Sequence, residues 1–355
     1  MRTLNSRFEN SRPDIVVLHD FVLDHYVTFR ESLVDVLSKI QPIADRGGGN
    51  IVVKQYLSRG GKASNLASAL AKLGCQVHLI ARTSRFGHSL AKMFLESEGV
   101  DISCVKSDGQ LALTVSIETK HEGRPINIML SDPGSNGTFG YSNISKKGLQ
   151  LIEESDGVVL ADWALNSRGT NLAKGVFGRV GRSKLLMIDP GDVSRRKNEV
   201  NELIDCVLRK GYGILSLNES EALYLAEKAS DERIGRRTVS PEYLGLEAAK
   251  ILAEEFNMRV DLHTRLFSAT ISNGHCLTAP TYRVEAKRVT GAGDAWNAGN
   301  IYAECIGLSD LHRLEFANAL AAYYVSSPEG AHPTFKVVSN LVKSWRSRRR
   351  RLAHP

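Results

Sequence analysis

The stretch GGKASNLASALAKLGCQVHLIA, residues 60–81, holds a glycine turn, a helix-forming segment and an apolar run in direct succession. Its middle part predicts a helix over 62–73 that ends before Gly74, a residue favoured just after helices. Its last part, QVHLIA at 76–81, is short and mostly apolar, and it predicts a buried strand. A helix followed by such a strand is the unit from which a helix-covered sheet is built.

Similar apolar runs occur along the whole chain and alternate with helical patterns. The runs that predict further strands are 14–20, 157–162, 184–189, 213–217 and 268–272. The patterns that predict further helices are 87–98, 145–155, 169–181, 196–209, 219–228, 244–256, 294–306 and 310–325. Several runs are apolar throughout, as in strands that are covered on both faces. The sequence therefore predicts an α/β fold in which a doubly wound, mainly parallel sheet has helices on both faces.

Two regions, 43–60 and 111–131, interrupt this alternation and look like hairpin strands with polar turns. We expect them to form a small β lid beside the main sheet. With 355 residues, the chain is long for one ordinary domain and short for three. We therefore expect a flexible N-terminus at 1–13, one large domain at 14–340 and a basic tail at 341–355.

The net charge of +7 comes almost entirely from the tail, because residues 341–355 hold six Lys and Arg residues and no acid. The rest of the chain is therefore close to neutral. Such a tail can contact nucleic acid or an acidic surface, or it can be a solvated chain end. The second interpretation is the more ordinary one, so we expect no nucleic-acid partner.

The five cysteines are widely spaced, odd in number and form no C-x-x-C pair, which argues against a zinc site and against a disulfide framework. A reducing cytoplasm suits such a chain. The N-terminal segment lacks the apolar stretch of a signal peptide, and no apolar run is long enough to span a membrane. We expect a cytoplasmic protein with no membrane partner.

The sequence TGAGD, residues 290–294, opens the predicted helix 294–306. A helix start exposes unpaired N–H groups and a partial positive charge, and glycines let that backbone approach a ligand closely. The turn is therefore a candidate anion site, and Asp294 beside it is a candidate general base. Together they suit phosphoryl transfer to an alcohol. The alternative is that Asp294 only caps the helix.

Other phosphate-binding motifs do not fit. The segment that ends in Gly61 and Lys62 lacks the first glycine and the Ser or Thr of a P-loop, and GAGDAW at 291–296 lacks the last glycine of a dinucleotide fingerprint. In doubly wound folds, ligands bind at the carboxyl ends of the strands. The polar residues that follow predicted strands, and so place candidate chemistry along that edge, are Asp24, Asp162, Asp189 and Asn218.

Five blocks of the chain, in order, resemble the ribokinase/PfkB-type carbohydrate kinase family. They are GGKASNLASALAKLG (60–74), FGHSLAKMFLESEGVDIS (86–103), LNESEAL (217–223), VTGAGDAWNAG (289–299) and ANALAAYYVSSPEGA (317–331). The resemblance covers roughly residues 14–335. It implies a ribokinase-like fold and a kinase that, with Mg²⁺, moves a phosphoryl group from ATP or ADP to a hydroxymethyl group of a small ribose-like sugar or sugar phosphate such as ribose 1-phosphate. A nucleoside kinase and, as a different class, a non-catalytic sugar or nucleotide sensor stay open as alternatives.

The resemblance also implies roles for individual residues. Asp294 corresponds to the catalytic base, and the backbone of Gly291, Ala292 and Gly293 to the anion hole. The residues expected to face the sugar are Asp24, Gly60, Gly61, Lys62 and Asn65. Those expected near the nucleotide phosphates are Asn218, Glu221 and Thr290, with Glu221 reaching Mg²⁺ through water. Judged by residue type alone, Asn218 and Glu221 can instead form a capping box, and Asp24 or Lys62 can face solvent.

The chain departs from the family pattern just before the late glycine turn and in the block after the strand at 76–81. Arg288 and Val289 stand where the family has Asp-Thr, which puts activation by a monovalent cation in doubt. In ARTSRFG, residues 81–87, a Gly-Asp pair is lost and Arg82 and Arg85 are gained. Arginine suits phosphate, so we expect these two residues to bind an anionic acceptor unless they face solvent.

A third departure concerns the phosphate donor. The segment DLHTRLFSATISNG, residues 261–274, replaces a threonine- and glycine-rich stretch of the family and carries His263 and Arg265. It resembles the ADP-dependent sugar kinases that share the fold, so His263 and Arg265 are candidate nucleotide contacts. We expect ATP as the donor, with ADP as the alternative, and we leave a homodimer open.

Overall fold

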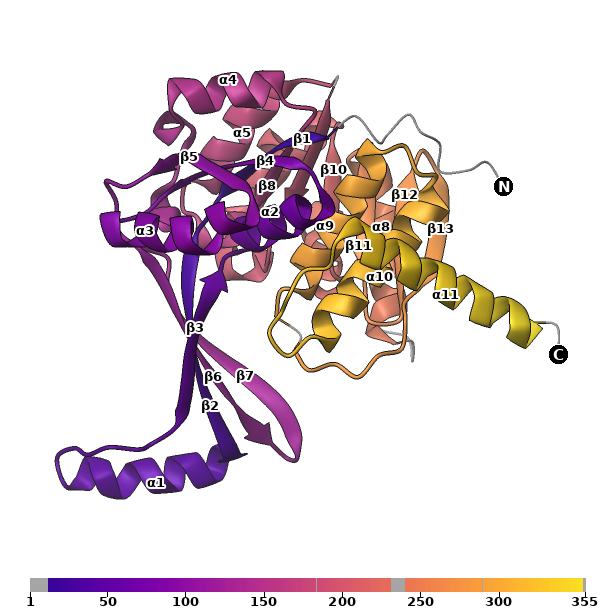
Figure 1. Ribbon diagram of the computed structural model, residues 1–355. Coiled ribbons are helices and arrows are strands. Elements are labelled where there is room, and N and C mark those ends of the chain that lie inside the picture. The colour runs from indigo at the N-terminus through magenta and orange to yellow at the C-terminus, as the bar shows by residue number, and fades with distance from the viewer. Residues whose placement is uncertain (1–11, 183, 231–239, 289, 354–355) are drawn as a thin grey trace.

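The computed structural model describes residues 12–182, 184–230, 240–288 and 290–353 (Figure 1). Nearly all of the segment predicted as a flexible N-terminus, and Val289, lie outside these ranges. Nine strands form the main sheet in the order β13-β12-β11-β10-β9-β8-β1-β4-β5. All neighbouring pairs from β11 to β5 are parallel, and only the pairs β11–β12 and β12–β13 are antiparallel. The predicted doubly wound, mainly parallel sheet is therefore confirmed.

The bounds of the main-sheet strands follow the predicted apolar runs closely, and three strands were missed. The strands are β1 Asp14–His19, β4 Gln76–Arg82, β5 Val100–Lys106, β8 Gly157–Ala161, β9 Leu185–Asp189, β10 Ile214–Leu217, β11 Arg259–His263, β12 Phe267–Ser272 and β13 His275–Pro280. The missed ones, β5, β11 and β13, lack a continuous apolar run. β11 even buries a charge, Asp261, at its centre.

Helices cover both faces of this sheet, at the predicted positions. They are α2 Lys62–Leu73, α3 Arg85–Phe94, α4 Lys146–Glu154, α5 Gly169–Val180, α6 Val200–Cys206, α7 Glu219–Ala229, α8 Pro241–Glu255, α9 Ala292–Cys305 and α10 Asp310–Ser326. Alternate residues of β1 point to opposite faces. Val16 packs in a core with α5 to α8, and Val17 packs in a second core with α2, α3 and α9. Among the described helices, none combines the length and apolar character that a bilayer crossing requires.

The lid is a four-stranded sheet in the order β3-β2-β6-β7, and Figure 1 shows it projecting from the body. The predicted strands at 111–131 are present as β6 Ala112–His121 and β7 Arg124–Asp132. The prediction for 43–60 is wrong in its first half, because only β3 Lys54–Gly60 is a strand. The other lid strand, β2 Val22–Ser32, was missed, as was helix α1 Leu33–Asp45 at the far end of the lid.

The first part of the basic tail is helical and packs on the body, so it is not the frayed chain end that was expected there. Helix α11 spans Phe335–Ala353. Trp345 stacks on Tyr282 with ring centroids 3.5 Å apart, and Arg346 forms an ion pair with Glu315 of α10. These contacts and the buried Val342 attach the first half of the tail to the body.

A network of buried ion pairs centred on Asp261 lies beneath α9 and α10. Asp261 is fully buried and receives Nη2 of Arg259 at 2.8 Å and Nη1 of Arg313 at 3.2 Å. These two guanidinium groups hold the pKa of Asp261 well below its usual range despite its burial. Arg313 is also fully buried. The network therefore connects β11 to helices α9 and α10.

Removal of Arg313 tests how much this network stabilises the fold. The variant Arg313→Met leaves Asp261 buried with one guanidinium fewer, so it should lower the free energy of unfolding by about 3–5 kcal/mol. The control Arg209→Met removes an arginine that is 42% exposed and pairs with Asp205 and Glu255 at the surface, and it should cost less than about 1 kcal/mol. Urea unfolding of both variants measures the difference, and equal losses would contradict this role of the network.

Candidate active site

Asp294 lies in the first turn of α9, after a left-handed turn at Gly291 with φ +86°. A Cβ on Gly291 would lie 2.4 Å from the Tyr324 hydroxyl, and a Cβ on Gly293 would lie 3.0 Å from Cε1 of His263. Packing behind the turn therefore excludes a side chain at Gly291 and leaves little room for one at Gly293. The N-cap residue Gly291 makes no side-chain hydrogen bond, so the first N–H groups of α9 have no cap from it, and Asp294 lies in the same turn.

The Asp294 carboxylate is buried between two side chains from the start of α2. Nδ2 of Asn65 donates to Oδ2 of Asp294 at 3.0 Å, and Nζ of Lys62 lies 3.8 Å from Oδ1. Burial raises the pKa of Asp294 to about 6, although Lys62 and Asn65 oppose the shift. At neutral pH the carboxylate form therefore dominates and remains a stronger base than an ordinary aspartate.

A chain of buried polar groups holds Lys62 in this position. Its Nζ lies 3.0 Å from Oδ2 of Asp189, at the end of β9. The same oxygen accepts from Nδ2 of Asn297 at 2.9 Å, and Asn297 in turn accepts from the Ser216 hydroxyl at 2.6 Å. Lys62 therefore faces the site, and the alternative that it is a solvent-facing helix residue does not hold, since its side chain is only 28% exposed.

Asp20 is a buried residue of this site that the sequence analysis missed. It follows β1 and accepts from the backbone N–H of Lys62 at 2.9 Å and of Ala63 at 2.6 Å. It thereby caps α2 from another strand. A Cβ on Gly61 would lie 2.6 Å from the Asp20 carboxylate, so the glycine makes this contact possible. Asp20 ends the apolar run 14–20, and that position was the available signal.

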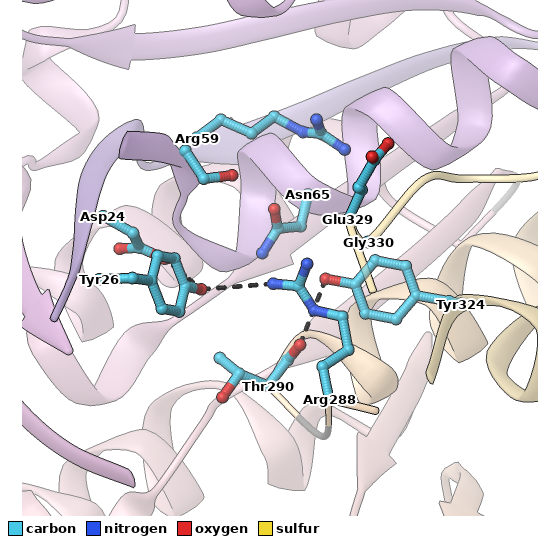
Figure 2. Close-up of a pocket in the computed structure, with 10 residues that line it drawn as sticks. Asp24, Tyr26, Arg59, Asn65, Arg288, Thr290, Tyr324, Glu329 and Gly330 are labelled. Atoms are coloured by element: carbon cyan, nitrogen blue, oxygen red, sulfur yellow. Dashed lines mark hydrogen bonds between the residues drawn. The ribbon is translucent and has the colours of Figure 1, made fainter. Parts of the chain in front are cut away.

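A pocket of about 260 Å³ opens between the lid and the body next to Asn65 (Figure 2). The lid contributes Asp24 and Tyr26 of β2 and Ser58 and Arg59 of β3. The body contributes Asn65, Arg288, Thr290, Tyr324, Glu329 and Gly330. The expected sugar-facing residues Asp24 and Asn65 are thus brought together, along with an arginine from each side.

Asp24 is nine-tenths or more buried in this pocket, so it is not a solvated turn residue. A Cβ on Gly60 would lie 2.1 Å from its carboxylate, which explains why β3 ends in a glycine there. The hydroxyl of Tyr26 donates to Asp24 at 3.4 Å. Burial raises the pKa of Asp24 to about 6, while the hydrogen bond from Tyr26 and the charge of Arg288 lower it.

Arg82 and Arg85, which were predicted to face the acceptor, do not line the pocket, and Arg265, which was predicted as a nucleotide contact, lies at the surface. Arg82 forms an ion pair with Asp108 at 3.0 Å, and Arg85 is exposed at the start of α3. Arg265 is 83% exposed and lies 3.4 Å from Glu242. The expectation that Arg82 and Arg85 face the acceptor is therefore corrected, because β4 ends near the edge of the sheet, beside β5, and its last side chain turns to Asp108.

The remaining candidates lie near the start of α9. His263 packs beneath Gly293 and against Trp296, and burial lowers its pKa to about 4, so its imidazole is neutral. The Thr290 hydroxyl accepts from Asn127 of β7 at 3.3 Å, and its carbonyl accepts from Tyr324 at 3.2 Å. Thr290 therefore lies on the acceptor side of the site, where it links the lid to the glycine turn.

Asn218 and Glu221 form the capping box of α7. Glu221 is also buried, and burial raises its pKa to about 7, opposed by the charge of Lys62. Within the described residues, no group of three or more His, Cys, Asp or Glu side chains could hold a metal ion by itself. Mg²⁺ is commonly bound through one or two carboxylates, water and nucleotide phosphates, and the carboxylate of Glu221 is of the type that could approach it through water.

Comparison with known proteins agrees with this geometry. The family model of the pfkB family carbohydrate kinases matches residues 34–162. The chain is 26% identical to a 5-dehydro-2-deoxygluconokinase of Clostridium beijerinckii over 82% of this chain and 85% of that protein. It is 24% identical to the bifunctional protein HldE of Helicobacter hepaticus, over 94% of this chain and 64% of that protein.

Solved structures show the same fold. A ribokinase of Arabidopsis thaliana complexed with ribose and ATP superposes with a TM-score of 0.70 at 20% identity, covering 94% of this chain and 99% of that one. A putative ribokinase II of E. coli in complex with ATP and Mg²⁺ gives 0.69 at 14% identity, with 94% and 99% covered. A nucleoside kinase of Methanocaldococcus jannaschii gives 0.65 at 16% identity, with 93% and 98% covered. The chain therefore has a ribokinase-like fold, and its residues 34–162 match the model of the pfkB family carbohydrate kinases.

The buried charge of Asp294 should reduce the stability of the fold. Its pKa is higher in the folded chain than in the unfolded one, so its contribution to stability is full at low pH and is lost as the pH rises through about 6. The variant Asp294→Asn should therefore be more stable than the parent protein at pH 8, by about 2–3 kcal/mol.

Urea unfolding at pH 8, 6 and 4 measures this effect, and the advantage of Asp294→Asn should shrink steadily as the pH falls. Asp108→Asn is the control, because Asp108 is exposed and its hydrogen bond from Arg82 lowers its pKa. The control variant should gain no stability at pH 8. A constant difference across the pH range would show that burial of the Asp294 charge is not the cause.

Proposed function

We propose that the protein transfers the terminal phosphoryl group of a nucleotide to a hydroxymethyl group of a small ribose-like sugar or sugar phosphate, such as ribose 1-phosphate. The observation that carries the proposal is the position of Asp294. This buried carboxylate has a pKa of about 6, follows a glycine turn at a helix N-terminus, and shares Asn65 with a polar pocket of small size.

In the proposed reaction, the acceptor lies in the pocket beneath the lid, and its hydroxymethyl group points past Asn65 toward Asp294. Asp294 takes the hydroxyl proton while the oxygen attacks the terminal phosphorus atom. The N–H groups of Gly291, Ala292 and Gly293 face the transferring group at the start of α9, where they stabilise its charge. Lys62 supplies a positive charge on the other side of Asp294.

The nucleotide and Mg²⁺ belong on the far side of Asp294, near the start of α7. Bound Mg²⁺ would supply positive charge that offsets the charge of the nucleotide phosphates. Glu221 is the carboxylate best placed to approach it through water, and Asn218 fixes Glu221 by the capping box. Two of the ribokinase structures similar to this chain contain ATP, which supports ATP as the donor, with ADP as the alternative.

Two other functions remain as alternatives. A nucleoside kinase has support from the similar fold of the Methanocaldococcus enzyme. A non-catalytic sugar or nucleotide sensor would not need a carboxylate with a raised pKa beside a helix N-terminus. A coupled assay with ATP, ADP or GTP against ribose, ribose 1-phosphate, nucleosides, fructose phosphates and inositol distinguishes the three.

Replacement of Asp294 tests its role as the base. The variant Asp294→Asn keeps the shape of the side chain and the contact with Asn65, but it cannot accept the proton, so kcat should fall about 10²–10⁴-fold. The KM for the acceptor should change little, and the variant should remain folded by circular dichroism. Retention of kcat within a few-fold would rule out this role for Asp294.

The pH dependence of the rate tests the same role independently. Because the carboxylate is the active form, kcat/KM should fall tenfold per pH unit below about pH 6. Lys62 lowers the pKa of Asp294, so Lys62→Met should shift this acid limb to higher pH, whatever the variant does to the maximal rate. A limb at the same pH in both proteins would show that a group other than Asp294 controls the rate.

A further inference from the structure

The pocket beside Asp294 contains two arginine side chains with unused hydrogen-bonding capacity. Arg59 reaches it from β3 of the lid and Arg288 from the segment before α9. In each guanidinium group, Nε is buried and has no hydrogen-bond partner among the described residues. Buried donors of this kind are rare in folded proteins unless a ligand completes them. Figure 2 shows the Arg288 guanidinium at the centre of the pocket, between the hydroxyls of Tyr26 and Tyr324.

Arg288 is fixed by contacts that leave its charge unpaired. Nη2 donates to the Tyr26 hydroxyl at 3.3 Å, and the guanidinium lies over the Tyr324 ring, 5.2 Å from its centroid. A Cβ on Gly330 would lie 1.9 Å from Nη1, so the chain after α10 passes close to this side chain only because it has a glycine there. Within the described residues, no carboxylate lies within ion-pair distance of Arg288. The group is held in place, yet its charge is available.

Arg59 faces the same space with its charge only partly offset. Its Nη2 lies 2.9 Å from Nδ1 of His332, and Nη1 lies 3.6 Å from Glu98. Burial and the nearby arginines hold the pKa of His332 well below its usual range, so the imidazole is neutral and Nδ1 accepts the hydrogen bond. The side chain is 14% exposed, so the surrounding water screens its charge weakly.

The charges in the pocket are therefore unevenly distributed. Asn65 both lines it and bonds to Asp294, so the side nearest the base carries carboxylates and amides. Arg59 from the lid and Arg288 from the body both line this pocket, which Asn65 connects to Asp294. The acids nearest to them in the pocket are Asp24, which is buried and holds a proton more readily than usual, and the exposed Glu329.

We propose that the acceptor is anionic, and that its carboxylate or phosphate group binds between Arg288 and Arg59. This inference rests on the proposed phosphoryl transfer to a sugar hydroxyl and names the acceptor class. Guanidinium groups bind both anions through paired hydrogen bonds, so sugar acids and sugar phosphates share the required chemistry. The 5-dehydro-2-deoxygluconokinase relative carries a name that denotes a kinase of a sugar acid. A neutral sugar brings no negative charge to Arg288, which has no carboxylate within ion-pair distance among the described residues, and it is discriminated against for that reason.

Substitution of Arg288 tests the inference through substrate choice. Ribose 1-phosphate and gluconate are the charged probes, one for each anion, and ribose and glucose are their neutral counterparts. The parent protein should show a kcat/KM at least 100-fold higher for a charged probe than for its neutral counterpart. Arg288→Gln should lower kcat/KM for that charged probe at least 30-fold, mainly through KM, and change the value for the neutral one less than 3-fold.

Matched variants separate the anion contact from a general loss of structure. Arg179→Gln removes a charge that pairs with Glu153 on α4, away from the pocket, and it should leave both probes unaffected. Arg288→Lys keeps the charge without the planar fork and should recover part of the lost affinity. If neutral sugars are the better substrates, or if Arg288→Gln affects charged and neutral probes equally, the inference is wrong.

Binding measured without turnover distinguishes failure of this inference from failure of the proposed function. Titration calorimetry of Asp294→Asn with ribose 1-phosphate and with gluconate should detect binding that falls at least 30-fold when Arg288→Gln is added. If that dependence is found but the parent protein phosphorylates no acceptor, the anion site stands and the kinase proposal fails. If the parent protein phosphorylates neutral sugars and the Asp294→Asn protein binds neither charged probe, the kinase proposal stands and the anion site is refuted.

Discussion

The arrangement of the site depends on one ammonium group, that of Lys62, among four acidic side chains. Asp162 follows β8, Asp189 ends β9, Glu221 lies in α7 and Asp294 in α9, and each of them raises the pKa of Lys62. The same ammonium lowers the pKa of Asp162, Glu221 and Asp294, which burial would otherwise raise further. Burying several carboxylates costs several kcal/mol each unless a counter-charge offsets the loss of hydration. The positive charge of Lys62 therefore offsets the cost of burying these four acids together at one edge of the sheet.

The position of Lys62 explains why the start of α2 and the base of the lid are built as they are. Lys62 is the first residue of α2. The helix must therefore begin at the edge of the sheet where the four acids lie. Asp20 fixes this start by accepting from two backbone N–H groups, and Gly61 leaves room for it. One residue earlier, Gly60 ends β3, where it pairs with Val22 of β2. The two lid strands therefore leave the body at the site itself, and any ligand beneath the lid lies close to Asp294.

Much of this could be predicted from the sequence, because the signals were local. The apolar runs and glycine turns predicted the parallel sheet and its helices, and the glycine turn before Asp294 marked the start of α9. The parts that were missed depend on contacts between distant segments. Arg59 reaches the pocket because β3 pairs with β2 in one register, and it meets His332 more than 250 residues later. No local pattern around Arg59 or His332 contains that information.

The mistaken assignment of Arg82 and Arg85 has the same origin. The sequence shows the charge of these two residues but not their place in the sheet. In the structure, β4 lies next to the edge strand β5 and not beside β8 and β9, whose acids surround Lys62. Arg288 provides the charge that these residues were expected to supply, from a position at which the family pattern has an acid. Its charge also lowers the pKa of Asp24, which burial raises. When an anion pairs with Arg288, that influence weakens and Asp24 gains affinity for a proton, so a single carboxyl group can then donate as well as accept a hydrogen bond with the acceptor. In the proposed anion site, Arg288 would therefore set both the anion preference of the pocket and the hydrogen-bonding character of Asp24.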